Sequence, residues 1–354
     1  MKICYFNLTE KIHTRDSVYI DGLKKLGVEI VDCRDWSPGL RKFWNLYKKH
    51  RALKNDYDVM FIGFSGHILV PFARLISRKK VVFNAMSSLY DGAFWSNKKT
   101  RGFLGWRMVY IWLLDWLVFH SADLSIADSN YRKEYIKHKF FVPDTKLAYL
   151  WNGVNDSIFI YDPNIKKLPV FTVLFRGAFM TEAGVEYLIQ AANILKSEPI
   201  KFRIIGSGHL APMVESMIGD LTLTNIEWIK EFLPWEELTA KMQECNLSIG
   251  QNSINKRQKV QIAFKTVENM ALKLPQVIAS NSLAILEVLT DKTTCIVVKY
   301  ADAQDLAKKI LWAKNNQIEL DRITENAYRL FKEKFTTEIL SKELKNILRK
   351  YCPH

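Results

Sequence analysis

The chain has 354 residues, of which 48% are hydrophobic and 25% are charged; this balance indicates one large or two ordinary folded domains and excludes a disordered protein. Its five cysteines are scattered and form no C-x-x-C pair, which excludes a disulfide framework or zinc site and fits a reducing cytoplasm. The formal net charge of +14 favours an anionic partner: nucleic acid, an anionic membrane surface or a polyanionic substrate.

Short apolar runs alternate with helical patterns along the chain, and this alternation predicts parallel sheets with crossover helices. Because the first run follows Met1 directly, we expect no signal peptide. In the first half, the predicted strands are 2–6, 28–32, 59–63, 80–84, 124–127 and 147–150. A polar stretch at 160–169 is predicted to be a linker, and the strands then resume at 171–175, 202–205, 226–229, 247–249, 276–279 and 295–298.

This pattern predicts an α/β protein of two doubly wound domains, residues 1–160 and 161–334, with a ligand cleft between the carboxyl ends of their strands. The chain ends in a long amphipathic helix from Phe335 to Tyr351, whose apolar residues recur at helical spacing. By the pattern alone, this helix packs on the second domain.

Basic and aromatic residues are interleaved in two segments of the first half, residues 40–55 and 94–119. The first contains Leu40, Phe43, Trp44, Tyr47, Arg41, Lys42, Lys48, Lys49, Arg51 and Lys54; the second contains Phe94, Trp95, Phe103, Trp106, Trp112, Trp116, Lys98, Lys99, Arg101 and Arg107. Such segments suit peripheral contact with an anionic membrane. The alternative, for 108–119 in particular, is a core-facing helix with a solvated basic side. A membrane span is not expected, because Arg107 and Asp115 interrupt the run, and no nucleic-acid-binding motif is present.

Residues 261–280 hold the most informative pattern. They predict a helix from about Phe264 to Pro275, then a buried strand at 276–279. Lys265 and Glu268 share one face of the first helical turn. They form either a surface ion pair or a nucleotide site. In a nucleotide site, the glutamate would accept both ribose hydroxyls, and the lysine and the free backbone N–H groups at the start of the helix would hold a phosphate.

Arg176 is a second candidate for holding phosphate. It follows the predicted strand at 171–175 and precedes a helix that we expect to begin near Glu182. It therefore lies at the carboxyl end of the strand, where anions bind in such sheets. A guanidinium group there suits a diphosphate, because its charge is permanent and its geometry is bidentate.

The run F-K-T-V-E-N-M-A at 264–271, with L-P-Q-V-I-A-S at 274–280, resembles the nucleotide-sugar signature of glycosyltransferase family 4, which has the GT-B fold. The resemblance covers nearly the whole chain and is firmest from 171 to 300. It implies two Rossmann-like domains facing across a cleft, with the C-terminal helix, 335–354, crossing back to the first domain. It also implies a retaining glycosyltransferase that needs no metal or other cofactor.

The resemblance assigns the donor contacts to Arg176, Gly177, Gly206, Gly208, Lys265, Thr266 and Glu268. Two departures put the assignment in doubt. Ala183 stands where the family commonly has a diphosphate-binding lysine, and Val260 stands where many members have a glutamate that contacts the donor sugar. Either Lys265 supplies the missing charge, or donor binding is weak or absent.

The acceptor side is expected in the first domain. Ser88-Leu89-Tyr90-Asp91 follows the strand at 80–84 and resembles a run in one subgroup of the same family. Asp91 would orient or deprotonate an acceptor hydroxyl, beside Ser88 and Tyr90; the alternative is a helix or turn cap. His67, after the neighbouring strand, is a weaker candidate, because a lone histidine is more often structural.

The expected function is therefore transfer of a sugar from a nucleotide-diphosphate donor to an acceptor hydroxyl, on a glycan or lipid-linked precursor at the cytoplasmic face of the membrane. Arg176, Lys265 and Asp91 are the expected catalytic residues. Two alternatives remain open: a sugar-nucleotide epimerase with the same fold, and a non-catalytic partner of an active enzyme, which Ala183 and Val260 favour. Asp56-Tyr57-Asp58 mimics a metal motif but precedes a strand, so we interpret it as structural.

Overall fold

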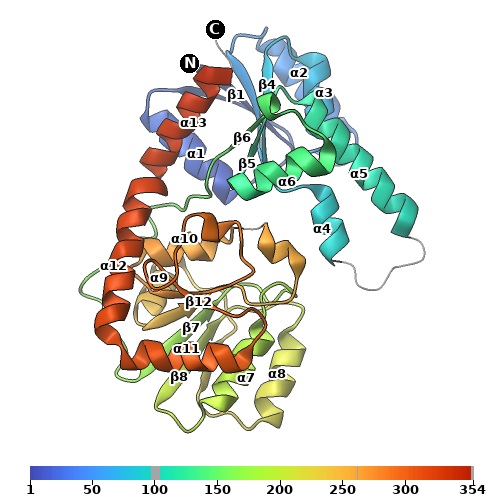
Figure 1. The fold of residues 1–354 in the computed structure, drawn as a ribbon. Coiled ribbons are helices and arrows are strands. Elements are labelled where there is room, and N and C mark those ends of the chain that lie inside the picture. The colour runs from blue at the N-terminus through green and yellow to red at the C-terminus, as the bar shows by residue number, and fades with distance from the viewer. Residues whose placement is uncertain (97–103, 261, 352–354) are drawn as a thin grey trace. The chain divides into compact units, whose positions relative to one another are not determined.

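The protein forms two compact units in a computed structural model that describes residues 1–96, 104–260 and 262–351 (Figure 1). Met1–Val154 and the end of the chain from Thr336 make up the N-terminal unit, and Asn155–Phe335 makes up the C-terminal unit. The chain therefore passes between units after Val154, somewhat earlier than the boundary at 160 that we expected.

The N-terminal unit is built on a parallel sheet with the strand order β2-β1-β3-β4-β5-β6. The strands are β1 (Lys2–Asn7), β2 (Glu29–Arg34), β3 (Val59–Ile62), β4 (Lys80–Met86), β5 (Leu124–Ala127) and β6 (Leu147–Tyr149). The central strands are buried on both faces, so they appear in the sequence as continuous apolar runs.

Helices cover both faces of this sheet. The helices are α1 (Thr14–Lys25), α2 (Arg41–Ala52), α3 (Leu69–Ile76), α4 (Leu89–Ser96), α5 (Leu104–Ser121), α6 (Asn130–Phe140), the 3-10 turn η1 (Asp144–Lys146) and α13 (Thr337–Tyr351). On one face, α2, α3, α5 and α6 enclose a single core with the sheet. On the other face, α1 and α13 enclose the second core.

The C-terminal helix α13 packs against α1 within the N-terminal unit. Leu340, Leu344 and Leu348 bury their side chains in the core beneath it. A Cβ atom at Gly22 of α1 would lie 1.8 Å from Ser341 Oγ, so the two helices approach closely because residue 22 has no side chain. This packing differs from the pattern-based expectation of a helix on the second domain.

The C-terminal unit repeats the architecture with the strand order β12-β11-β10-β7-β8-β9, again parallel. Its strands are β7 (Phe171–Arg176), β8 (Ile200–Ile205), β9 (Ile226–Ile229), β10 (Leu247–Ile249), β11 (Gln276–Ala279) and β12 (Ile296–Val298). Its helices are α7 (Val185–Ile194), α8 (Ala211–Asp220), α9 (Trp235–Gln243), α10 (Phe264–Ala271), α11 (Ala303–Asn315) and α12 (Gln317–Lys334), with 3-10 turns η2 (Lys256–Lys259) and η3 (Ile285–Glu287).

Two helix boundaries differ from the predictions. Helix α10 ends at Ala271 rather than at Pro275, because Lys273 adopts a left-handed conformation (φ 49°) and the residue before a proline avoids helical geometry. Helix α7 begins at Val185 rather than near Glu182, because Gly184 (φ 68°) is its N-cap residue.

The structure overturns one of the two interpretations of the basic and aromatic segments. Leu40, the residue before α2, and Trp44 are exposed, whereas Phe43 of α2 packs on Phe72 of α3. In α5, the outer side is apolar rather than basic, so the alternative of a core-facing helix with a solvated basic side is wrong. The side chains at 94 and 95, and residues 98, 99, 101 and 103, lie outside what the structure describes, as do Gln261 and residues 352–354.

Candidate functional site

The predicted donor residues of the C-terminal unit meet at the carboxyl end of β7. Arg176 is the last residue of β7, and its Nη1 donates to Oε2 of Glu268 on α10. Glu268 is buried, and burial raises the pKa of its carboxyl group against the opposing effect of the Arg176 and Lys265 charges. The carboxylate assigned to ribose therefore accepts a hydrogen bond from the guanidinium assigned to diphosphate.

Lys265 lies in the first turn of α10, with its ammonium nitrogen 4.5 Å from the centroid of the Phe175 ring. Burial, and then the charge of Arg176, lower the pKa of Lys265 to about 7, although Glu268 acts in the opposite direction. Two cationic groups thus surround one carboxylate. An anionic ligand would relieve this repulsion, because a nearby negative charge favours the protonated lysine.

The start of α10 reinforces this positive field. Its N-cap residue is Ala263, and no side chain caps the helix there. Because the N-terminal end of a helix carries a partial positive charge, α10 directs its dipole toward the same region as Lys265. Thr266 is buried, and its backbone N–H and C=O bond to Ala263 and Gln276, so its main-chain groups hold the helix in place.

The glycines of the predicted site shape the loops that follow β7 and β8. Gly177 and Gly206 have φ values of 138° and 133°, which other residues rarely adopt. A Cβ atom at residue 206 would lie 2.3 Å from the carbonyl oxygen of Gly177, and one at Gly208 would lie 2.7 Å from the backbone nitrogen of Phe179. The two loops can therefore lie against each other only because these positions lack side chains.

The two departures from the family pattern are both buried. Ala183 and Val260 contribute apolar side chains to the interior, so neither position presents a polar group. Close to Ala183, Arg257 of η2 donates to Glu182 at 3.1 Å. Lys265 and Arg176 are therefore the cations of the predicted donor set.

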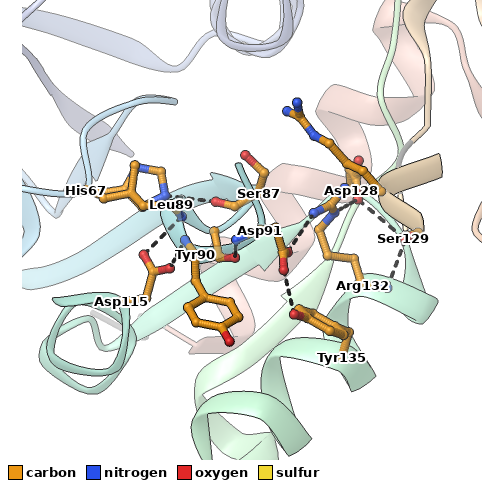
Figure 2. Close-up of polar contacts among 12 residues, drawn as sticks. His67, Ser87, Leu89, Tyr90, Asp91, Asp115, Asp128, Ser129, Arg132 and Tyr135 are labelled. Carbon is orange, nitrogen blue, oxygen red and sulfur yellow. Dashed lines mark hydrogen bonds and ion pairs between the residues drawn. The ribbon is translucent and has the colours of Figure 1, made fainter. Parts of the chain in front are cut away.

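In the N-terminal unit, Asp91 is the centre of a buried polar cluster (Figure 2). The hydroxyl of Tyr135 donates to Asp91 Oδ1 at 2.5 Å, and Arg132 Nη1 lies 3.7 Å from Asp91 Oδ2. Arg132 also donates to Asp128 at 2.8 Å. Among the described residues, the partners of the Asp91 carboxylate are these two side chains of α6 and not a helix N–H group.

The other predicted acceptor residues surround α4. Ser88 caps the helix, since its hydroxyl accepts from the backbone N–H of Asp91 at 3.1 Å. Tyr90 is partly buried beneath the ammonium group of Lys139, 4.6 Å from its ring centroid. His67 is buried, and its Nε2 bonds to the carbonyl oxygen of Ser87 at 2.8 Å.

Burial lowers the pKa of His67 to about 4, so its imidazole stays neutral at physiological pH. A group so hard to protonate is a poor general acid. Among the described residues, the Nδ1 atom of His67 has no hydrogen-bond partner.

Sequence reasoning missed three residues of this cluster: Asp115, Arg132 and Tyr135. Asp115 of α5 accepts from the backbone N–H groups of Leu89 and Tyr90, at 3.2 and 2.7 Å. Burial raises the pKa of Asp115 to about 7. A signal for Arg132 was present, because Asp128 directly follows the predicted strand at 124–127 and stands four residues before Arg132. Asp115 offered no local signal.

A surface hollow of about 450 Å³ runs along α6, lined by Tyr131, Glu134, Tyr135, His138 and Lys139. Tyr135 joins this hollow to Asp91 through its hydroxyl. The hollow thus places two aromatic rings and polar side chains next to the candidate acceptor residue.

A second network, also missed, is buried at the start of α1. Arg15 donates to Asn84 and Asn152 at 2.7 and 2.5 Å, and Asp16 accepts from Tyr5 and from Asn84. All these groups are paired, so the network fixes the loops at the carboxyl ends of the strands.

The structural interpretation of the Asp56-Tyr57-Asp58 triplet agrees with its contacts, since both carboxylates bond to Lys2. Within residues 1–96, 104–260 and 262–351, no cluster of histidine, cysteine, aspartate or glutamate is placed to hold a metal ion.

Two six-stranded parallel sheets of this order, each covered by helices, define the GT-B fold of glycosyltransferases. Residues 160–330 match the family model described as "Glycosyl transferases group 1". No curated protein matches the sequence.

Solved structures share the fold over the whole chain. HepE (Alr3699) of Anabaena in complex with UDP-glucose is 15% identical, with a TM-score of 0.75, and the match covers 99% of this chain and 100% of HepE. The sucrose-phosphate synthase of Thermosynechococcus elongatus is 13% identical, with a TM-score of 0.76, and the match covers 99% of this chain and 98% of that protein. A glycosyltransferase of Rickettsia africae is 14% identical, with a TM-score of 0.72 and 99% coverage of both chains.

Proposed function

We propose that the protein is a glycosyltransferase that moves a sugar from a nucleotide-diphosphate donor to an acceptor hydroxyl. The observation that carries the proposal is the cluster of Arg176, Lys265 and Glu268 at the carboxyl end of β7 and the start of α10. The family-model match covers this unit, and HepE, a protein of the same fold, has been solved with UDP and with UDP-glucose.

Donor binding would proceed by an exchange of partners at Glu268. Ribose hydroxyls would replace the Arg176 guanidinium on the carboxylate, and the guanidinium would turn to the diphosphate together with Lys265. Each charge keeps an opposite or hydrogen-bonding partner through this exchange, so none is left buried and unpaired. The phosphates would also lie at the start of α10, where the helix dipole favours negative charge.

Catalysis would depend on stabilising the departing nucleoside diphosphate. As the bond between the sugar and the diphosphate breaks, negative charge grows on the diphosphate. Once Arg176 has turned, its guanidinium, Lys265 and the α10 terminus would stabilise that charge. We expect retention of the anomeric configuration and no metal requirement, as in the family that the signature resembles.

On the acceptor side, Asp91 would orient the attacking hydroxyl and accept its proton, while Tyr135 and Arg132 fix the carboxylate. Ser88, Tyr90 and the hollow along α6 are candidate contacts for the rest of the acceptor. We expect the acceptor to be a lipid-linked or cell-surface glycan precursor at the cytoplasmic face of the membrane, in line with the basic and aromatic segments. Helix α5 is not long and apolar enough to span a membrane, and neither is any other helix in the described parts of the chain.

A non-catalytic role remains the second candidate, because Ala183 and Val260 are buried and present no polar group to a donor. A sugar-nucleotide epimerase is less well supported, because it needs acid and base groups around the sugar and His67 is buried with a pKa of about 4.

A thermal-shift screen against UDP, GDP, ADP, TDP and their common sugars tests donor binding. A ligand at 100 times its Kd stabilises the fold by roughly 2.7 kcal/mol. We expect a shift with one nucleotide class that Arg176→Ala and Glu268→Ala both abolish. Absence of a shift with every nucleotide would favour the non-catalytic role.

A further inference from the structure

The exposed side of α5 presents an apolar residue at each turn. Trp106 is 88% exposed, Tyr110 65% and Leu113 51%, and the exposed stripe continues through Trp116 and Leu117. These residues recur every three or four positions and therefore line one side of the helix. Exposed apolar stripes of this kind mark a surface that binds a partner.

Another helix on the same face of the sheet carries exposed basic side chains. Helices α2, α3 and α5 cover the same face of the sheet, and α2 adds the exposed Trp44 together with Arg41, Lys48 and Arg51 (Figure 1). Within the described bounds of these three helices, the one acidic residue is Asp115, which is fully buried.

Of the acidic residues at the edges of this layer, one offsets a basic residue of α2. Asp35 is paired with Lys49, and Asp123 is paired with Lys80 and lies 4.0 Å from Arg74. On the same face of the sheet as the apolar stripe, α2 thus presents Arg41, Lys48 and Arg51, and no ion pair joins these three side chains to an acidic group among the described residues.

We propose that the outer surface of α5 and α2 docks on an anionic lipid bilayer. Tryptophan and tyrosine suit the boundary between headgroups and acyl chains, and leucines between them suit shallow insertion. Each basic side chain near an anionic membrane strengthens binding by about fivefold.

Two other occupants fit this surface less well, one because of its charge and the other because of its apolar side chains. In a symmetric dimer through this surface, identical patches would face each other, so the basic side chains of α2 would repel those of the second copy. A nucleic acid would match the charge, but Val109, Leu113 and Leu117 offer nothing to a phosphate backbone. A bilayer matches both the charge and the apolar stripe.

The same helix connects this surface to the candidate acceptor site. From its inner side, Asp115 accepts from the N–H groups of Leu89 and Tyr90 and so holds the start of α4, which carries Asp91 (Figure 2). If the proposed function holds, on which this step rests, a docked α5 would bring Asp91 close to the membrane surface. The acceptor would then be a hydroxyl on a lipid-borne headgroup.

Vesicle binding of the full chain tests the docking surface. The probes are sonicated vesicles of phosphatidylcholine alone and of an equal mixture with phosphatidylglycerol, measured by co-sedimentation. We expect at least tenfold tighter binding to the anionic vesicles. The double variant Tyr110→Ser/Leu113→Ser should bind at least tenfold more weakly, and Arg41→Gln/Lys48→Gln roughly 25-fold more weakly, from about fivefold for each charge.

A matched control comes from the C-terminal unit, where Phe232 is 89% exposed and Ile318 86% exposed. The Phe232→Ser/Ile318→Ser variant should bind anionic vesicles like the wild type, which separates a specific surface from general stickiness. All the substituted side chains are exposed, so thermal melts should be unchanged.

The proposal would be overturned by equal binding to neutral and anionic vesicles, or by α5 variants that bind vesicles like the wild type. An α5 variant that converts a dimer to a monomer in sedimentation would also overturn it. Tight binding of single-stranded RNA without vesicle binding would assign the surface to nucleic acid instead. Nucleotide binding by the same variants, measured by thermal shift, separates the docking proposal from the glycosyltransferase proposal. Nucleotide binding without vesicle binding would contradict only the docking surface, and the reverse would contradict only the transferase.

Discussion

The pH dependence of nucleoside diphosphate binding follows from the environment of Lys265. Burial and the charge of Arg176 lower its pKa to about 7, so the free protein loses the ammonium charge just above neutral pH. A bound diphosphate favours the protonated form and raises this pKa, so binding above pH 7 takes up a proton. Affinity should therefore fall as pH rises.

The magnitude follows from the pKa of about 7. Between about pH 7 and about pH 8.5, the protonated fraction of the free lysine falls from roughly one half to roughly one thirtieth. If binding selects the protonated form, Kd should rise roughly 16-fold over this interval, with uptake of roughly one proton per ligand at the higher pH.

Isothermal titration calorimetry at the two pH values, in buffers of different ionisation enthalpy, measures both quantities. The ligand is the nucleoside diphosphate selected from UDP, GDP, ADP and TDP. Lys265→Met should lose the proton uptake, whereas Lys308→Met, an exposed lysine of α11, should keep it. Titration of the nucleotide itself contributes equally to the proton uptake of all three proteins. The difference in proton uptake between the wild type and Lys265→Met therefore reports on Lys265. Equal proton uptake by wild type and Lys265→Met would refute the reasoning.

Three further outcomes are expected. Gly206→Ala should lower the free energy of unfolding by roughly 2–4 kcal/mol in a denaturant melt. Its Cβ atom would lie 2.3 Å from a backbone oxygen, and the backbone there has a φ of 133°. The control Gly219→Ala has open space around the added Cβ atom and should not lower the free energy of unfolding. The pKa of Asp115 is raised to about 7, so the folded protein binds this proton more tightly than the unfolded chain does. Relative to Asp115→Asn, the free energy of unfolding of the wild type should therefore fall by up to roughly 4 kcal/mol as pH rises from about 4 to about 7. Free energies of unfolding that change in parallel with pH in the two proteins would contradict this. Tyr135→Phe, which removes a hydrogen bond to Asp91, should lower kcat roughly tenfold without changing nucleotide Kd; a changed Kd alone would contradict it.

The sequence predicts the fold because parallel strands buried on both faces are continuous apolar runs. Each predicted strand lies within a few residues of an observed one, and the two-domain GT-B arrangement of sheets is confirmed. Helix ends were less predictable. Lys273 and Gly184 set the ends of α10 and α7 through left-handed backbone conformations, which residue types alone do not fix.

In the candidate site, spacing along one helix could be predicted and contacts between distant elements could not. Lys265 and Glu268 share a turn, so their proximity follows from helical geometry. The bond from Arg176 to Glu268 joins residues 92 positions apart, and that from Tyr135 to Asp91 joins residues 44 apart. No local pattern specifies such pairs; they arise only when the strands and helices pack.

The outer surface of α5 shows the limit of hydropathy patterns. Residues 104–121 are apolar on nearly all sides, which in a globular protein usually indicates a buried helix. The structure buries Val118 and Phe119 but leaves Trp106 and Leu113 exposed. A sequence pattern identifies which side chains are apolar, whereas the exposure of each side chain depends on whether other elements pack against it in the fold.

Sugar transfer itself is the most direct test of the proposed function. The protein is incubated with a nucleotide sugar labelled in the sugar and a bacterial lipid extract, and label is measured in the lipid fraction. The proposal predicts incorporation by the wild type, loss with Glu268→Ala, and retention with Lys308→Met. A protein that binds the nucleotide but incorporates no label from any donor into any acceptor fraction would contradict the proposed activity and support a non-catalytic role.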